Sequence, residues 1–351
     1  MFQSELEYVH HAENPIKDIK SVADFLNALY SKICGIKDWS EHIDNCLKKI
    51  DSTEEKEKIK RTLIPYDFAE CIDAEILFRG QSNRDYALLP SIAREYSCDG
   101  ISKNNLIGKE KDIIESACLK YPDVFKETLL PIEKLALLQH YGVPTRLLDL
   151  TENPLVALFF ACLNDENQDG EILIFFNFRQ EINPYPVMQA IADTYRFTSK
   201  SGFSTLENFK NEMLKQEYFR CHADEYAKKF NKKENLISVF SKPIIVNAPV
   251  RTQRQIAQKG KYMLFPNNVY LGKDKEHSFF CDEIDEYPKN HPYCERIIIP
   301  KESKNNLLKG LSLVGVDKST LFPENFDYAC CNLVQEIIAR RTYDEMLNKG
   351  R

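Results

Sequence analysis

One short segment, residues 141–154, carries a turn, a polar cluster and the start of a helix, and it constrains the fold more than any other part of the chain. Gly142 and Pro144 interrupt the backbone, and Pro154 stands where a helix would begin, with Asn153 as its N-cap. Residues 155–162 are apolar, which predicts a buried helix. Polar side chains stand just ahead of it, at Thr145, Arg146, Asp149, Thr151 and Asn153. A helix N-terminus with an arginine nearby suits a phosphate or a carboxylate, so we expect a binding site here.

A second polar segment follows an apolar pair at residues 76–77 and contains Arg79, Gly80 and Gln81. We expect Arg79 to leave a buried strand at its exposed end, where its guanidinium offers a rigid fork of donors to phosphate oxygens. Gly80 would let a backbone approach closely. The alternative for Arg79 is a structural ion pair with a carboxylate such as Asp149.

These two segments resemble the FRG domain family, named for the Phe-Arg-Gly triplet that stands here at residues 78–80. The resemblance continues in order along the chain, through Leu88-Leu89-Pro90-Ser91-Ile92-Ala93-Arg94, Gln139-His140-Tyr141-Gly142, Pro144-Thr145-Arg146-Leu147-Leu148-Asp149 and Asn153-Pro154-Leu155. It covers residues from about 19 to 177. It implies an FRG-like core and leaves the biochemical activity open.

Length and composition fit an ordinary globular protein. The 351 residues suffice for one large domain or two ordinary ones, and 43% of them are hydrophobic. A formal net charge of -6 disfavours nucleic-acid binding over the whole surface, although a local basic face can lie within an acidic total. No apolar run approaches the roughly 20 residues that span a bilayer, and the first residues lack a signal-peptide pattern. We therefore expect a cytoplasmic protein with no membrane partner.

The 11 cysteines are expected to be free thiols rather than disulfides, because their number is odd and residues such as Cys118 and Cys162 have apolar neighbours. No Cys-x-x-Cys pair occurs, and Cys281 with Cys294 lacks the second pair that a zinc ribbon needs. The spacing therefore predicts no structural metal.

Apolar periodicity predicts an amphipathic first helix over residues 19–33 and further helices over 104–121, 132–141 and 154–163. In the second of these, Glu110 and Glu115 are expected to face solvent. A charged helical hairpin is expected over residues 40–63, with Ser40 as a cap. Short apolar runs predict strands at residues 171–176, 243–246, 262–265 and 296–299, and the run at 171–176 is expected to be central. Residues 143–148 are expected to form either a short strand or an extended arm.

Strands scattered among helices without regular βαβ spacing favour an α+β fold. We expect four parts: an FRG-like core over residues 19–180 with a helical insertion at about 38–66, a helical insertion over 181–240, the remaining core strands over 241–300, and a C-terminal helical segment over 301–351 with a helix at 328–347.

The order of elements is also similar to that of the ADP-ribosyltransferase superfamily, in which an early strand carries Arg or His, a middle segment brings Ser, Thr or Tyr, and a late strand entrance carries Glu. Arg79 matches the first position, and Thr145 or Thr151 the second. Gln258 and Gly260 stand where the glutamate is expected, which would weaken transfer chemistry, although Gln258 can bind a ribose hydroxyl. The similarity implies a mixed-sheet core of that type, NAD as the cofactor, and ADP-ribosyl transfer or NAD glycohydrolysis.

Three further candidates have two interpretations each. His140 carries an imidazole that serves either as an acid or base, or as a cap of its own helix. Arg146 either contacts a ligand or is anchored to Asp149. A basic arm precedes an apolar strand, and it forms either a small anion-binding surface or a solvated face; its cations are Arg251, Arg254, Lys259 and Lys261.

Three functions stay open at this stage. The first is a cleft for a nucleotide-type ligand such as NAD, with Arg79, Thr145, His140 and Gln258 as catalytic candidates and with ligand contacts at Arg79, Gly80, Gln81, Arg146, Thr151, Asn153, Arg251 and Arg254. The second is a module that senses nucleic acid or a protein through the basic arm, in a bacterial defence or toxin setting. The third is an interaction scaffold whose partner surface lies in residues 184–236.

Overall fold

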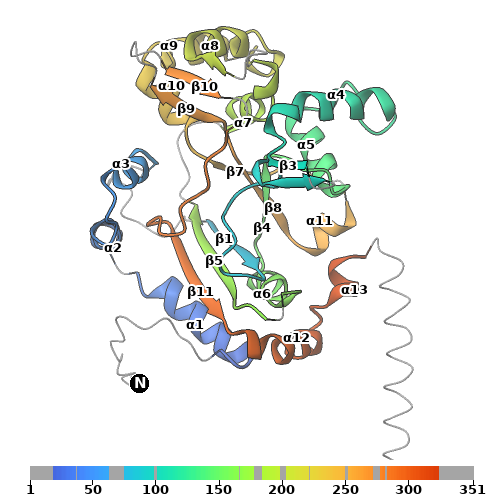
Figure 1. The fold of residues 1–351 in the computed structure, drawn as a ribbon. Coiled ribbons are helices and arrows are strands. Elements are labelled where there is room, and N and C mark those ends of the chain that lie inside the picture. Colours follow the sequence, from blue (N-terminus) through green and yellow to red (C-terminus); the bar gives the residue numbers. More distant parts are fainter. Residues whose placement is uncertain are drawn as a thin grey trace, which may run out of the picture.

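The computed structural model describes residues 19–36, 38–62, 75–98, 101–165, 167–177, 184–197, 203–220, 222–249, 252–271, 277–280 and 283–323. Its centre is a six-stranded antiparallel sheet in the order β11-β5-β1-β4-β8-β7 (Figure 1). The strands are β1 (Glu75–Gln81), β4 (Leu147–Thr151), β5 (Gly170–Asn177), β7 (Ile244–Val246), β8 (Gly260–Leu264) and β11 (Cys294–Ile299). The predicted α+β class is confirmed, because helices surround the sheet. The expected mixed sheet was wrong, because all the described strand pairs of this sheet are antiparallel.

The two halves of this sheet are joined by few backbone pairs. β1 is registered with β5 along its whole length, from Glu75 to Gln81. Its register with β4 contains one pair, Phe78 opposite Thr151. β4 in turn is registered with β8 over all five of its residues. The sheet is therefore weakest between β1 and β4, where side chains have to supply additional links.

Helix α6 (Pro154–Cys162) packs tightly against one half of the sheet. It starts as the sequence predicts: the Oδ1 atom of Asn153 accepts the backbone N–H of Leu155 at 3.0 Å. Two glycines of the sheet allow the close approach. A Cβ on Gly80 would collide with backbone atoms of residues 157 and 161, and one on Gly170 with the carbonyl oxygen of residue 161. Helices α1 (Val22–Cys34) and α12 (Lys304–Leu313) share the same apolar cluster.

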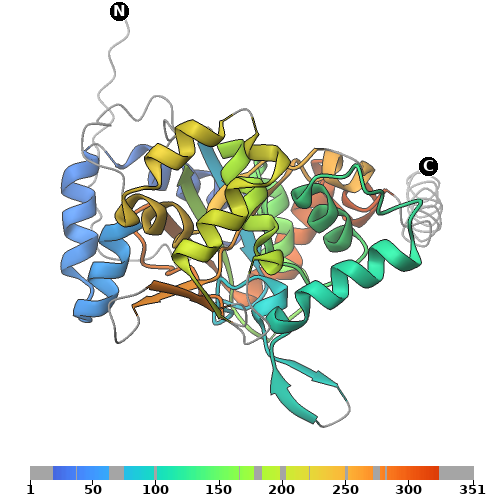
Figure 2. The ribbon, with the colours of Figure 1, turned by 90° about the horizontal axis from the view of Figure 1, so that it is seen from above.

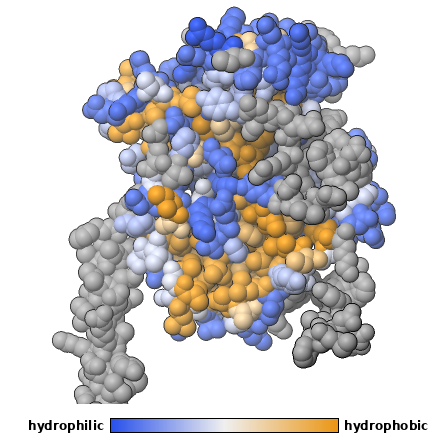
Figure 3. Space-filling model, turned by 180° about the vertical axis from the view of Figure 1, so that it is seen from behind, coloured by the Kyte–Doolittle hydropathy of each residue, from blue (hydrophilic) through white to orange (hydrophobic). Residues whose placement is uncertain are grey.

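The other half of the sheet packs on α5 (Pro131–His140) and α7 (Pro184–Ala192), beneath a helical layer at the top of Figure 1. That layer contains α8 (Leu206–Leu214), α9 (Ala223–Lys229) and α10 (Lys233–Phe240). It is joined by a three-stranded sheet of β6 (Phe203–Thr205), β10 (His277–Phe280) and β9 (Asn268–Leu271). From behind, this upper layer is mostly hydrophilic, and apolar residues gather lower down (Figure 3).

The opposite face of the large sheet is covered by segments made of loops and short 3₁₀ helices, at residues 91–93 and 107–109, rather than by α-helices. Leu88, Ile92 and Ile107 come from one such segment and Ile284 from another, and all four pack on the strands in a third apolar cluster. Between them the hairpin β2 (Tyr96–Cys98) and β3 (Ile101–Asn104) projects from the body (Figure 2). Such loop-covered faces leave room for polar grooves.

The remaining helices are α2 (Trp39–Lys48), α3 (Thr53–Thr62), α4 (Glu110–Lys120), α11 (Gln253–Ala257) and α13 (Lys318–Leu321). Several sequence expectations need correction. The hairpin of α2 and α3 exists, but Asp38 caps α2, because its Oδ1 atom accepts the N–H of Ser40 at 2.8 Å. The predicted helix over 104–121 begins only at Glu110, which is 2% exposed rather than solvated. The predicted strand over 143–148 lies at Leu147–Thr151. The predicted helix over 328–347 falls outside the described residues.

Among the residues that the structure describes, no helix is long and apolar enough to cross a membrane. Of the described cysteines, Cys162 and Cys294 are buried, and Cys118 is partly buried. Burial raises the pKa of the Cys162 thiol to about 12, so it is not a nucleophile near neutral pH.

Candidate functional site

Arg79 lies on β1 and reaches across the weak junction of the sheet. Its Nη1 atom donates to the backbone carbonyl of Asp149 on β4 at 2.7 Å, and its Nε atom donates to Oε1 of Gln81 at 3.2 Å. Arg79 is partly buried, and burial lowers its pKa to about 10. The residue therefore binds the peptide carbonyl of Asp149, whereas the structural alternative raised from the sequence was an ion pair with its carboxylate.

A chain of side-chain hydrogen bonds runs from Asp149 to the turn at residues 143–146. Nε2 of Gln139 donates to Oδ2 of Asp149 at 3.0 Å, and Oε1 of Gln139 accepts from the Thr145 hydroxyl at 2.7 Å. Thr145 is 1% exposed, and its hydroxyl also accepts the N–H of Leu147 at 3.1 Å. These hydrogen bonds hold the backbone in place where β4 begins. The catalytic role suggested for Thr145 stays a prediction.

Arg146 is 1% exposed, and protein atoms surround its guanidinium. Glu110 binds it through two oxygens, with the Nε to Oε1 distance at 2.8 Å. Nη1 donates to the carbonyl of Phe265 at 3.0 Å and to Oδ1 of Asn267 at 2.9 Å. Its partner is thus Glu110 on α4, not Asp149. An arginine with four protein acceptors fixes the packing of α4 on the sheet and has little surface left for a ligand.

The polar residues around the start of α6 also bind within the protein. The Thr151 hydroxyl donates to the carbonyl of Gln258 at 2.6 Å and accepts the N–H of Asn153 at 3.0 Å. Nε2 of Gln258 donates to the carbonyl of Leu321 at 3.1 Å. Thr151, Asn153 and Gln258 therefore lie together, but most of their polar atoms have protein partners.

The basic arm is only partly described, because Arg251 lies outside the described residues. Arg254 on α11 stacks over the Phe322 ring, with Cζ 4.8 Å from the ring centroid. Nζ of Lys261 binds Glu75 and Glu152, the latter at 2.7 Å. Arg254 and Lys261 thus each have protein contacts of their own, while Lys259 is exposed.

A small cavity lies beside Asp149 and brings several of the predicted site residues together. Its volume is about 50 Å³, and it is lined by Gln139, His140, Asp149, Leu150, Thr252, Arg254, Gln255, Gln258, Gly260 and Tyr262. His140, Arg254 and Gln258 come from three segments far apart in the sequence. Arg79 is not among its lining residues. The volume admits one small chemical group or a few water molecules, which is far less than a dinucleotide needs.

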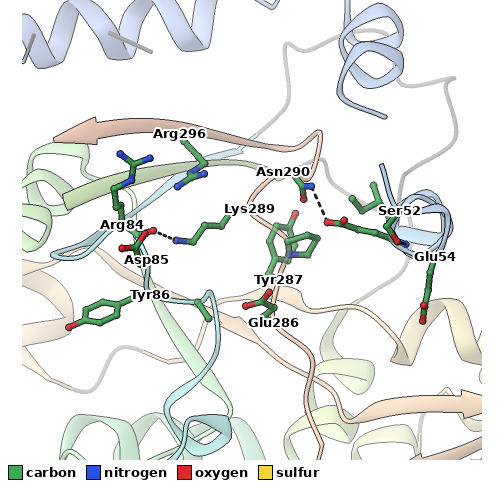
Figure 4. A pocket seen from close by; sticks show the side chains of 14 residues that line it. Ser52, Glu54, Arg84, Asp85, Tyr86, Glu286, Tyr287, Lys289, Asn290 and Arg296 are labelled. Carbon is green, nitrogen blue, oxygen red and sulfur yellow. Dashed lines mark hydrogen bonds between the residues drawn. The ribbon is translucent and has the colours of Figure 1, made fainter. Parts of the chain in front are cut away.

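A much larger groove of about 720 Å³ lies between α3, the loop after β1 and the segment before β11 (Figure 4). Arg84, Lys289 and Arg296 form its cationic end, with Asp85 and Tyr86 beside them, while Ser52 and Glu54 lie at the other end. None of these residues was a candidate from the sequence. They come from four separate parts of the chain, at residues 52–59, 84–87, 286–290 and 296.

A buried carboxylate holds the cationic end together. Glu171 on β5 is 0% exposed and accepts from Lys289, from Nε of Arg296 at 2.9 Å and from Nη2 of Arg296 at 2.5 Å. Nζ of Lys289 also donates to the carbonyl of Arg84 at 2.7 Å. A single charged residue within an otherwise apolar strand was the one signal in the sequence that could have indicated this cluster.

Residues 74–170 match the sequence model of the FRG domain family. The chain therefore contains an FRG domain. No curated protein and no solved structure matches the chain. The similarity to the ADP-ribosyltransferase superfamily accordingly stays a prediction, as does the division of the chain into four parts.

The FRG domain contributes β1, the projecting hairpin, α4, α5, β4 and α6. It also contributes Arg84 to the groove, whereas Lys289 and Arg296 come from beyond the FRG domain. Buried Gln81 connects the groove with Arg79: its Nε2 atom donates to Oε1 of Glu171 at 3.1 Å, while its Oε1 atom accepts from Arg79. The Arg79 and Gln81 pair predicted to contact a ligand thus supports the groove from within the FRG domain.

Proposed function

We propose that the FRG domain and the strands beside it bind a nucleotide-type ligand in the large groove, with its phosphates at the cationic end, and that NAD is this ligand. The observation that carries the proposal is the cluster of Arg84, Lys289 and Arg296 at one end of a 720 Å³ groove. Small-molecule sites typically measure about 300 to 1,000 Å³, which includes ligands of this size.

The cationic end has donors to spare for a phosphate. Lys289 and Arg296 carry two positive charges against the single charge of buried Glu171, and Arg296 uses only Nε and Nη2 for that carboxylate. Its remaining N–H groups, and the Lys289 ammonium, belong to residues that line the groove. Arg84 is held loosely, because its Nη1 atom lies 3.6 Å from Asp169 and its side chain is 47% exposed. A guanidinium fork of this kind matches phosphate oxygens.

The rest of the groove suits the other parts of a nucleotide. The Tyr86 ring is 48% exposed and offers an aromatic surface to a base. The carboxylates of Glu54 and Glu55 at the far end of the groove can accept hydrogen bonds from sugar hydroxyls. In dinucleotide-binding proteins an acidic side chain commonly binds the ribose in this way. Arg79 supports this site indirectly, through Gln81 and Glu171.

The proposal is tested by thermal unfolding of the full chain with NAD, ADP-ribose or adenosine, followed by an assay for nicotinamide release from NAD. We expect NAD and ADP-ribose to raise the melting temperature and adenosine to raise it far less, because adenosine lacks phosphates. Release of nicotinamide would establish NAD cleavage as the activity, and intact NAD would establish a binding protein. Equal stabilisation by adenosine, or none by any of the three, would contradict phosphate recognition in the groove.

A further inference from the structure

The small cavity beside Asp149 lies on the opposite face of the sheet from the cationic end of the groove. Paired residues of neighbouring strands share a face, and alternate residues of one strand do as well. Phe78 pairs with Thr151, so Asp149 shares the face of Phe78, together with its own partner Tyr262. Arg79 and Gln81 point to the other face, toward Glu171. The cavity is therefore a second site, independent of the groove.

Three residues that line the cavity have polar atoms without a hydrogen bond to any described residue. Tyr262 is 6% exposed, and its hydroxyl has no partner in the described part of the chain. Asp149 uses Oδ2 for Gln139, which leaves Oδ1 available. Gln258 uses its amide nitrogen for Leu321, which leaves its amide oxygen available. The Tyr262 residue is buried, but its hydroxyl oxygen is not one of the described buried atoms that lack a partner, so this donor is accessible from the cavity that the residue lines.

The charges around the cavity favour a neutral occupant. The Asp149 carboxylate acts on two nearby cations, Arg79 and Arg94, and Arg254 lines the cavity itself. A cationic ligand therefore gains little from a carboxylate that is already balanced. An anionic ligand would be repelled by that same carboxylate. The free groups are two acceptor oxygens and one hydroxyl donor, so the complementary group has N–H donors and one acceptor.

We propose that this cavity binds a primary carboxamide. Its NH₂ group donates to Oδ1 of Asp149 and to the amide oxygen of Gln258, and its carbonyl accepts from the Tyr262 hydroxyl. The volume of about 50 Å³ accommodates this group alone. The rest of the ligand would lie at the mouth, where exposed Tyr141 follows the lining residue His140 and has its ring centroid 5.0 Å from the imidazole.

The test uses three pyridines that differ only in the substituent: nicotinamide, nicotinate and 3-acetylpyridine. Ligand-observed NMR titration of the full chain gives the dissociation constant of each. We expect about 1 mM or tighter for nicotinamide, as for other small ligands, and at least tenfold weaker binding for the other two. Nicotinate replaces the N–H donors with a negative charge, and 3-acetylpyridine lacks them. Equal binding of 3-acetylpyridine, or no saturable binding of nicotinamide, would overturn the proposal.

Two variants locate the binding. Tyr262→Phe removes only the hydroxyl and is expected to weaken nicotinamide binding at least fivefold. Asp149→Asn is also expected to weaken nicotinamide binding. Because Asp149 is exposed, this second variant can be used if Tyr262→Phe does not fold. Tyr121→Phe is the matched control: it makes the same change at a tyrosine that is 61% exposed and lines neither the cavity nor the groove, and it is expected to leave nicotinamide binding unchanged. Unchanged binding in both cavity variants would contradict the assignment. Tyr262→Phe is expected to bind ADP-ribose with the affinity of the wild type. Nicotinamide binding therefore tests the cavity, ADP-ribose binding tests the groove, and either proposal can fail without the other.

Discussion

Arg79 donates a hydrogen bond to the backbone carbonyl of Asp149 at 2.7 Å, at the junction where β1 and β4 share a single registered pair. The arginine thus replaces backbone pairing between the two halves of the sheet. Burial lowers its pKa to about 10, which still leaves the guanidinium charged at neutral pH. A residue that the sequence suggests as a ligand contact is therefore also a link within the sheet.

We predict that Arg79→Ala lowers the free energy of unfolding by about 1.5 to 3 kcal/mol, the range for hydrogen bonds to charged groups. Urea unfolding followed by circular dichroism measures this change. Arg220→Ala is the matched control, because the Arg220 side chain is 80% exposed and lies 3.9 Å from its acidic partner. An Arg79→Ala variant with wild-type stability and no affinity for ADP-ribose would instead assign Arg79 to the ligand.

The buried pair of Arg146 and Glu110 gives a second prediction. Their side chains are 1% and 3% exposed, so Glu110→Gln leaves a buried guanidinium without its counter-charge. We expect a loss of about 3 to 5 kcal/mol in unfolding free energy. Glu57→Gln breaks a comparable pair with Lys60, but both side chains are more than half exposed, and we expect less than about 1 kcal/mol. Chemical denaturation gives the unfolding free energy of both variants. Equal losses would show that the contribution of an ion pair to stability does not depend on its burial.

Gly80→Ala tests the contact between β1 and α6. A Cβ at this position would overlap backbone atoms of α6, which cannot move as a flexible side chain can. We expect a loss of at least about 3 kcal/mol, at the upper end of overpacking effects, or failure to fold. Gly142→Ala is the comparison: its φ of 76° disfavours alanine, but no atom lies within 4 Å of the added Cβ, so we expect about 1 kcal/mol. Thermal unfolding that ranks Gly142→Ala as the more harmful change would refute the packing argument.

His291 gives the pH prediction. It is 3% exposed, and burial, together with the charge of Lys242, lowers its pKa from 6.5 to about 3. Between these two values the unfolded chain takes up a proton that the folded chain does not, so stability falls as pH drops below about 6.5. At pH 5 this amounts to roughly 2 kcal/mol. Urea unfolding of His291→Gln at pH 5 and pH 7 should show a smaller pH-dependent loss than wild type; an identical loss would exclude His291 as the cause.

Local features of the fold could be predicted from the sequence. The start of α6 is one, because the Asn153 cap and the following proline act on adjacent residues, and the apolar run of β5 is another. Glu110 was wrongly expected to face solvent, since its partner Arg146 lies 36 positions away and no local pattern connects them. The first helix was correct in position, and its apolar residues Phe25, Ala28 and Leu29 are buried, although Tyr30 is 64% exposed.

The groove could not be predicted, because strand register creates it. Lys289 and Arg296 meet Glu171 only after β11 has paired with β5, more than a hundred residues away in sequence. Of the polar cluster before α6, Asp149 alone lines the small cavity, together with His140, Arg254 and Gln258. The sequence could not show that Thr145 and Arg146, which belong to the same motif, are buried within the protein.

The central claim is that the cationic end of the groove binds the phosphates of a nucleotide-type ligand. The most direct test is the dissociation constant of ADP-ribose, measured by isothermal titration for wild type, Arg84→Gln and the exposed control Arg220→Gln. We predict saturable binding that weakens at least about tenfold, or about 1.4 kcal/mol, in Arg84→Gln and not in Arg220→Gln. Equal affinity in all three proteins, or no binding at millimolar ADP-ribose, would contradict this account.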